Sequence, residues 1–141
     1  MSKYIALGLM IWFGFMCSAA RSSQHNKPMA AKPRYEITFD FVSWDFGPLK
    51  KGETRTKIIP FTNTGTDPVT IEFMSACECT SFTFPEDPLA PGAKGQLEIT
   101  FDSAQKEVNE MISVQLLLKE KDPESGYQIV YELKYTYQLV Q

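Results

Sequence analysis

The chain has 141 residues, which predicts one domain, and its 14 Lys and Arg against 17 Asp and Glu leave a formal net charge of −3. This balance excludes a nucleic-acid binder held by bulk positive charge. Three cysteines are too few for a disulfide-built mini-protein, and a single histidine argues against a His-dependent catalytic triad or a multi-histidine metal site.

The N-terminus has the pattern of a secretory signal. Lys3 precedes the uncharged apolar run Ile5–Met16, which is shorter than the roughly 20 residues that a membrane-spanning helix needs. Small residues around Ala19 suit cleavage by signal peptidase. We therefore expect residues 1–20 to be a signal peptide, and no later segment is apolar enough to span a membrane.

Cys17 offers a second way to process the same segment. Bacterial lipoproteins are cut directly before a cysteine, which then carries lipid. Met16 and Gly14 stand where a small residue and a leucine are usual, whereas Ser18 and the polar stretch after it suit a lipid tether. Cleavage after Ala20 and lipidation at Cys17 both remain open. Either one predicts an exported protein, in the periplasm or at the outer membrane or cell surface.

Residues 21–34 form a polar segment with two prolines and no apolar period, which predicts a flexible linker. The only histidine, His25, lies here, and we interpret it as a solvated side chain and not as a ligand. Charge is distributed unevenly along the chain, because residues 21–57 sum to +4 and residues 58–141 sum to −8. The pattern is that of an acidic domain on a basic tether.

Residues 35–141 alternate between apolar and polar side chains, which is the period of a half-buried β-strand. The last run is the clearest, since six aromatic or aliphatic residues occupy every second position from Ile129 to Leu139. The expected strands are Tyr35–Phe41, Thr54–Asn63, Val69–Ser75, Thr80–Phe84, Leu97–Asp102, Met111–Lys119 and Gln128–Leu139.

Turn residues separate these runs and set the expected fold. Gly47-Pro48 and Lys51-Gly52 are expected to break the chain after the first strand, and Pro60 marks an edge or a bulge. Only residues 103–109 could hold a helical turn. The sequence therefore predicts an all-β fold, an Ig-like antiparallel β-sandwich of about seven strands, with a closed barrel as the runner-up.

Several short motifs occur together between Trp44 and Asp102. In chain order they are Asp45-Phe46-Gly47, Lys51-Gly52-Glu53, Phe61-Thr62-Asn63-Thr64-Gly65, Ala76-Cys77-Glu78-Cys79-Thr80, Ala90-Pro91-Gly92 and Phe101-Asp102. This order resembles the bacterial family known as domain of unknown function 1573. The resemblance implies an Ig-like sandwich in an exported protein, and it implies no particular chemistry.

The sequence departs from that family pattern in the cysteine motif. Glu78 stands where the family usually has glycine between the cysteines, and Ala76 replaces the usual serine. The Cys-x-Cys-Thr core is kept, so the expected fold is unaffected. The substitution at Glu78 weakens any argument that this loop needs the backbone freedom of glycine.

Cys77 and Cys79 remain after signal removal and are the most unusual feature of the domain. Positions i and i+2 of a regular strand lie about 6.6 Å apart, whereas a disulfide needs Cβ atoms about 3.8 Å apart. A bond between them therefore needs a turn or a bulge. Three interpretations stay open: a local disulfide or two buried thiols, a soft-metal site for Cu(I), and a redox or partner-linking role.

Other catalytic signatures are missing from the sequence. Glu86-Asp87 lies in a proline-bounded loop and is interpreted as solvated surface, and no glycine-rich phosphate loop opens a helix. We expect no enzyme activity and no cofactor.

The sequence instead favours a non-catalytic protein-binding or assembly module of the cell envelope, with a protein partner. Its contact surface would be the strand Tyr127–Val140 if that strand lies at a sheet edge. The alternative is a copper- or thiol-handling protein built on Cys77 and Cys79.

Overall fold

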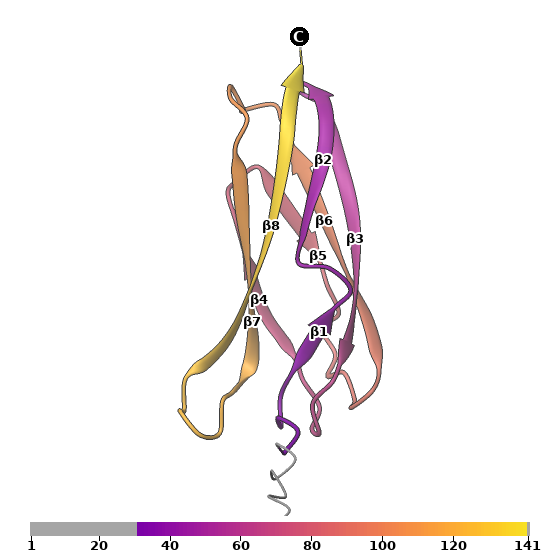
Figure 1. Cartoon of the computed structure of the whole chain (residues 1–141), viewed down its shortest axis with the longest axis vertical. Helices are drawn as coiled ribbons and strands as arrows, with labels where there is room; N and C mark the ends of the chain where they lie inside the picture. The colour runs from indigo at the N-terminus through magenta and orange to yellow at the C-terminus, as the bar shows by residue number, and fades with distance from the viewer. Residues whose placement is uncertain (1–30, 141) are drawn as a thin grey trace, which may run out of the picture. The chain divides into compact units, whose positions relative to one another are not determined.

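The computed structural model describes residues 31–140, and these residues form eight β-strands and no helix (Figure 1). The all-β sandwich predicted from the alternation is confirmed. The strands are β1 (Ile37–Phe39), β2 (Ser43–Lys50), β3 (Thr54–Asn63), β4 (Ile71–Ser75), β5 (Thr80–Thr83), β6 (Lys94–Asp102), β7 (Met111–Lys121) and β8 (Gln128–Val140).

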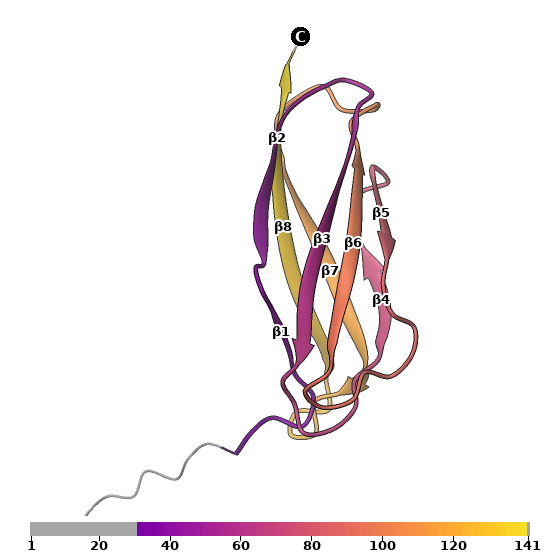
Figure 2. The ribbon, with the colours of Figure 1, turned by 90° about the vertical axis from the view of Figure 1, so that its right-hand side faces the viewer.

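The strands form two four-stranded sheets, ordered β1-β3-β6-β5 and β2-β8-β7-β4. In Figure 2 the strands β3 and β6 of the first sheet face the viewer, and β8 and β7 of the second sheet lie behind them. All pairs are antiparallel except β2 and β8, which run parallel (Figure 1). The expectation of a wholly antiparallel sandwich was therefore wrong for this one pair.

The extra strand β2 contains the Gly47-Pro48 pair that the sequence had predicted to be a break. Instead of ending the strand, the pair falls at a register shift between Asp45 and Pro48 in the ladder with β8. Gly47 has a φ of 74° and donates its N–H to Asp45 Oδ1 at 2.9 Å. A bulge of this kind lets a strand continue past residues that cannot join the ladder.

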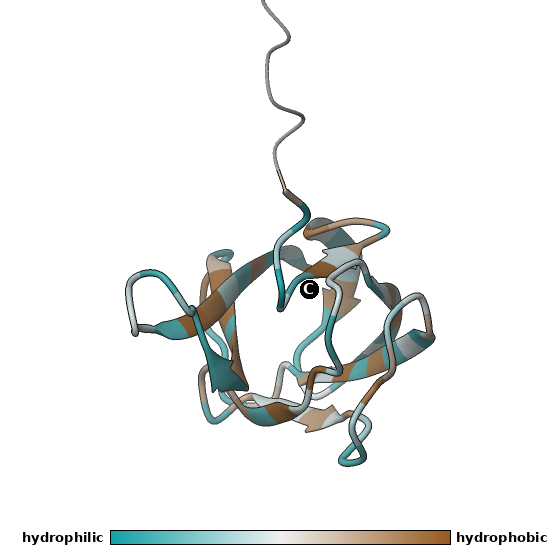
Figure 3. Ribbon diagram, turned by 90° about the horizontal axis from the view of Figure 1, so that it is seen from below, coloured by the Kyte–Doolittle hydropathy of each residue, from teal (hydrophilic) through white to brown (hydrophobic). Residues whose placement is uncertain are grey.

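The core lies between the two sheets, and Figure 3 shows hydrophilic and hydrophobic residues alternating along the strands. On β8 the inward residues Leu133, Tyr135 and Tyr137 are at most 1% exposed. On β6 the residues Leu97, Ile99 and Phe101 are completely buried. The period-two pattern therefore identified the core side of both strands correctly.

The long strand β8 lies inside its sheet, between β2 and β7. The sequence offered the strand Tyr127–Val140 as the contact surface on the condition that it lies at a sheet edge. β8 does not lie at an edge, so this expectation was wrong. Pro60 lies where β3 passes beyond the end of β1, whose last residue, Phe39, pairs with Phe61. The Pro60 carbonyl there accepts a hydrogen bond from Asp40 N at 3.1 Å.

The motif Asn63-Thr64-Gly65 builds a turn. Asn63 is fully buried, and its amide group donates to the carbonyls of Asp67 at 2.9 Å and Leu89 at 2.8 Å. Its Oδ1 accepts the N–H of Gly65 at 2.9 Å. A Cβ at Gly65 would clash with the backbone of residues 34–36, so the close approach of the two chain segments requires glycine.

Candidate functional site: the corner between β4 and β5

The cysteine motif lies at a corner where the chain crosses from one sheet to the other. β4 ends at Ser75 in one sheet, and β5 begins at Thr80 in the other. Two backbone hydrogen bonds hold the corner, from Thr80 N to Cys77 O at 3.0 Å and from Asp102 N to Cys79 O at 2.9 Å. The second bond ties the corner to the end of β6.

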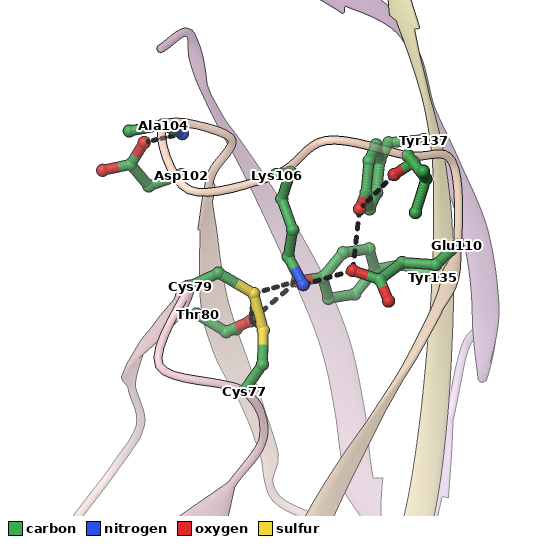
Figure 4. Close-up of a disulfide and its surroundings, with 10 residues drawn as sticks. Cys77, Cys79, Thr80, Asp102, Ala104, Lys106, Glu110, Tyr135 and Tyr137 are labelled. Carbon is green, nitrogen blue, oxygen red and sulfur yellow. Dashed lines mark hydrogen bonds and ion pairs between the residues drawn. A yellow bond between two sulfur atoms is a disulfide. The ribbon is translucent and has the colours of Figure 1, made fainter. Parts of the chain in front are cut away.

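A disulfide joins Cys77 and Cys79 in this turn (Figure 4). Their Cα atoms are 5.1 Å apart, which is within the usual range for a disulfide and shorter than the i,i+2 spacing of an extended strand. Both cysteines are half-buried, and Glu78 between them is exposed. While the bond is intact, neither sulfur can serve as a thiolate ligand for a metal.

The Thr80 hydroxyl lies beside both sulfurs. Thr80 Oγ1 is 3.3 Å from Cys77 Sγ and 3.6 Å from Cys79 Sγ. It is also 2.7 Å from the phenol oxygen of Tyr135, which is itself 4.0 Å from Cys79 Sγ. Because disulfide sulfurs carry no hydrogen, they can only accept, and Thr80 has one proton to give. When Thr80 donates that proton to sulfur, Tyr135 donates to Thr80 Oγ1.

The pKa of Tyr135 is raised to about 12, first by burial and in smaller part by the negative charge of Glu110, while the hydrogen bond with Thr80 acts to lower it. The phenol is therefore protonated at neutral pH and available as a donor. Burial also raises the pKa of Tyr137, whose hydroxyl donates to Glu110 Oε1 at 2.9 Å. Hydrogen bonds from Lys106 and Tyr137 lower the pKa of Glu110, and Figure 4 shows this second polar group near the disulfide.

A hollow of about 220 Å³ opens beside the disulfide. It is lined by Glu78, Cys79, Asp102 and Gln105. Glu78 and Asp102 are both exposed, so the hollow carries negative charge. Cys77 does not line it, so the two sulfurs have different surroundings.

Aromatic side chains pack behind Tyr135. Trp44 stacks on Tyr135 with ring centroids 5.5 Å apart, and Phe46 and Phe101 pack edge-on or tilted against it at 5.0 and 5.3 Å. Trp44 Nε1 is buried without a hydrogen-bond partner in residues 31–140. This cluster fixes the Tyr135 ring and hence its hydroxyl.

The structure brings together only part of what the sequence singled out. Cys77 and Cys79 meet, whereas Glu86 and Asp87 are exposed in their loop. Cys17 and His25 lie outside the described residues, as does the predicted signal segment. Within residues 31–140, no three His, Cys, Asp or Glu side chains group as a metal site requires. The same residues contain no helix long and apolar enough to cross a membrane.

Sequence reasoning missed the Thr80–Tyr135 contact. Tyr135 was correctly placed on the inner face of its strand, but the partner is 55 residues away along the chain. The sequence feature that could have pointed to this contact is Thr80, the threonine directly after the second cysteine.

Comparison with solved structures supports the fold. The chain resembles the ASH / PapD-like domain of human CEP192 at 13% identity with a TM-score of 0.60, covering 99% of both chains. It resembles a protein of unknown function from Porphyromonas gingivalis W83 at 18% identity with a TM-score of 0.61, covering 81% of this chain and 51% of that one. At these identities the likeness shows the fold alone.

A comparison with curated proteins found no match. The model of one protein family, described as protein of unknown function (DUF1573), matches residues 37–129 of the chain. This span contains the turn motif, the cysteine corner and seven complete strands of the sandwich. The chain therefore belongs to the DUF1573 family.

Proposed function

We propose that the chain is an exported, non-catalytic protein-binding or assembly module of the cell envelope, and that it binds an extended segment of a partner along β4. The signal pattern of residues 1–20 supports export. The edge position of β4 supports strand addition, in which backbone hydrogen bonds give affinity and side chains give specificity.

One observation carries the proposal, an apolar row on the outer face at the β4 edge. Phe73 pairs with Leu117, and Leu117 pairs with Val130, so three apolar side chains lie side by side across β4, β7 and β8. Phe73 is 53% exposed and Val130 is 49% exposed. An apolar residue of an added strand would extend this row and cover Phe73.

The other edges are less suited to accept a strand. β1 has only three residues, β5 has four, and β2 carries the Gly47-Pro48 bulge. The open stretch of β3 contains Arg55 and ends at Pro60. Short length, bulges, charge and proline are the devices by which sheet edges resist pairing. β4 itself has five residues and a register shift at Glu72, which leaves both Glu72 and Phe73 exposed. The choice of β4 as the binding edge therefore rests on the apolar row at Phe73 and not on freedom from such devices.

Site-specific photo-crosslinking in the native cell envelope tests the proposal. A photoreactive residue at position 73 should give one discrete adduct with a partner protein. The same residue at Ile58 is the matched control, because Ile58 is 50% exposed on the other sheet. No adduct at position 73, or equal adducts at both positions, would contradict binding at β4.

A charge at the same position gives a second test. Phe73→Lys places a lysine on the edge and should abolish the adduct formed from a photoreactive residue at Val130. Ile58→Lys should leave that adduct unchanged. Thermal melting should show both variants within about 0.5 kcal/mol of the parent, as expected for surface substitutions, so that loss of binding is not loss of folding.

A further inference from the structure

We propose that the Cys77–Cys79 disulfide is a thiol–disulfide exchange site with a fixed polarity: an incoming thiolate attacks Cys79 Sγ, and Cys77 leaves under the Thr80 hydroxyl. This inference does not depend on the proposed binding role of β4. It rests on the unequal surroundings of the two sulfurs.

Access favours attack on Cys79. Cys79 lines the open hollow at the corner, together with Glu78, Asp102 and Gln105. Both cysteines are half-buried, but Cys79 is the one that borders open space, and exchange needs a clear approach to one sulfur.

Hydrogen bonding favours Cys77 as the leaving group. Thr80 Oγ1 is closer to Cys77 Sγ, at 3.3 Å, than to Cys79 Sγ, at 3.6 Å. Tyr135 Oη lies 2.7 Å from Thr80 Oγ1, and when Tyr135 donates to Thr80 the Thr80 proton is free to point toward sulfur. Tyr135 Oη is 4.0 Å from Cys79 Sγ, so the shortest hydroxyl contact with either sulfur is that of Thr80 with Cys77. A hydrogen bond to a charged acceptor is stronger than one to a neutral acceptor, so this contact tightens as negative charge develops on Cys77. Exchange is faster when the leaving thiolate is stabilised.

The exchange balances with a dithiol as reductant. Its first thiolate bonds to Cys79 Sγ, the Cys77–Cys79 bond breaks, and Cys77 leaves as a thiolate that takes up a proton. The second thiol of the reductant, as a thiolate, then attacks the reductant sulfur of the mixed disulfide. Cys79 leaves as a thiolate and takes up a proton. Two electrons and two protons pass from the dithiol to the protein, and the reductant becomes a disulfide.

Charge at the hollow selects among incoming thiols. Glu78 and Asp102 are exposed and line the same hollow as Cys79. Lys106, the nearest basic residue along the chain, is paired with Glu110. A cationic thiol should therefore react faster than an anionic one, and added salt should reduce the difference.

Mapping the first mixed disulfide tests the polarity. The full mature protein is mixed with cysteamine, quenched at short times with a maleimide, and sequenced by mass spectrometry across Cys77-Glu78-Cys79. We expect cysteamine on Cys79 and maleimide on Cys77. The reverse pattern, or reaction only after unfolding in denaturant, would overturn the proposal.

Variants of the hydroxyl test the leaving-group contact. Thr80→Val should slow formation of the mixed disulfide with cysteamine about tenfold, the loss expected for one hydrogen bond to a charged group. Thr80→Ser should restore the rate, and Ser81→Ala, on the same strand, should not change it. If Thr80→Val keeps the parent melting temperature and the parent rate, the Thr80 contact has no role in exchange and the proposed polarity fails.

Paired reagents test the charge selection. Cysteamine should form the mixed disulfide faster than 2-mercaptoethanesulfonate after correction for thiol pKa, and the ratio of the two rates should fall in Glu78→Gln and Asp102→Asn. Glu86→Gln is the control, since Glu86 is exposed outside the hollow. A ratio near one in the parent protein would contradict selection by this charge.

Discussion

Cys77 and Cys79 enclose a single residue, so their disulfide removes little freedom from the unfolded chain. The loop-entropy relation gives about 1–2 kcal/mol for so short a loop, against about 3 kcal/mol for a loop of 15 residues. The fully buried residues of the core come from both sheets, and the two half-buried cysteines pack against them. The disulfide is therefore distinguished more by its position beside the hollow than by its contribution to the stability of the fold.

Replacing both cysteines with serine should therefore lower the free energy of unfolding by only about 1–2 kcal/mol and leave partner binding at β4 intact. Urea unfolding and the crosslink from position 73 measure the two effects separately. A double variant that keeps full stability but loses its partner would show that the sulfurs belong to the binding site.

Leu133 gives a sharper test of the core. It is completely buried on β8, and Leu133→Asp would place an unpaired charge between the sheets. We expect a loss of at least about 4 kcal/mol and an unfolded domain. Val130→Asp is the control, because Val130 is 49% exposed on the same strand and should change stability little. An unchanged melting temperature for Leu133→Asp would contradict the placement of β8 in the core.

The sequence predicted which residues face the core better than which residues meet there. Leu133 and Tyr135 follow a period of two, which the sequence displays directly. The contact between Thr80 and Tyr135 depends on the packing of two sheets, and no local pattern encodes it. The two cysteines could be recognised as unusual, but the difference between them comes from their tertiary neighbours.

At the scale of elements, β2 shows why a turn signal can mislead. Gly47-Pro48 has turn chemistry, yet the ladder with β8 resumes at Pro48 after the register shift. An edge strand tolerates proline because one side of its backbone has no partner to satisfy. The strand Thr54–Asn63 was predicted to its last residue, because turn residues lie at both of its ends and no bulge interrupts it.

β8 also makes the sandwich sensitive to alkali. Its inward tyrosines Tyr131, Tyr135 and Tyr137 all have a raised pKa, caused first by burial. For Tyr135 the pKa rises from 10.0 to about 12. A group with a raised pKa contributes stability that is fully present below its unfolded pKa and is lost as the pH rises through its folded pKa.

We therefore expect the free energy of unfolding to fall between pH 10 and pH 12, the window set by the two pKa values of Tyr135. Tyr135→Phe should flatten this decline, since phenylalanine has no proton to lose, although it should lower stability near pH 7 by removing the bond to Thr80. Denaturant titrations at a series of pH values measure both effects. A slope equal to that of the parent would show that Tyr135 does not titrate on unfolding.

At the scale of the whole molecule, strand order was beyond the reach of the sequence. Alternation and turn residues indicate strands but not their neighbours, so β8 could not be placed inside its sheet and β2 could not be paired parallel to it. Parallel pairing joins residues far apart in the chain, as with Leu49 and Leu139, and leaves no hairpin signal.

Export belongs to this scale too, and the mass of the mature protein tests it. Purified from its native cell, the protein should begin at or near Arg21, or at a lipidated Cys17 whose added mass identifies the acyl chains. Intact-mass spectrometry distinguishes the two products, with a preparation made without export as the control. A native protein that still carries Met1 would contradict the signal prediction.

The parallel pairing of β2 with β8 has a mechanical consequence. Residue 31 and residue 140 lie at opposite ends of the sandwich, and the two strands run in the same direction between them (Figure 1). A pull applied between these points would slide β2 along β8 and load their hydrogen bonds together, whereas a hairpin pulled from its open end separates one bond at a time. If the N-terminal side is fixed to a membrane and the C-terminal side is drawn away, this ladder resists extension together with the pairing of β1 with β3.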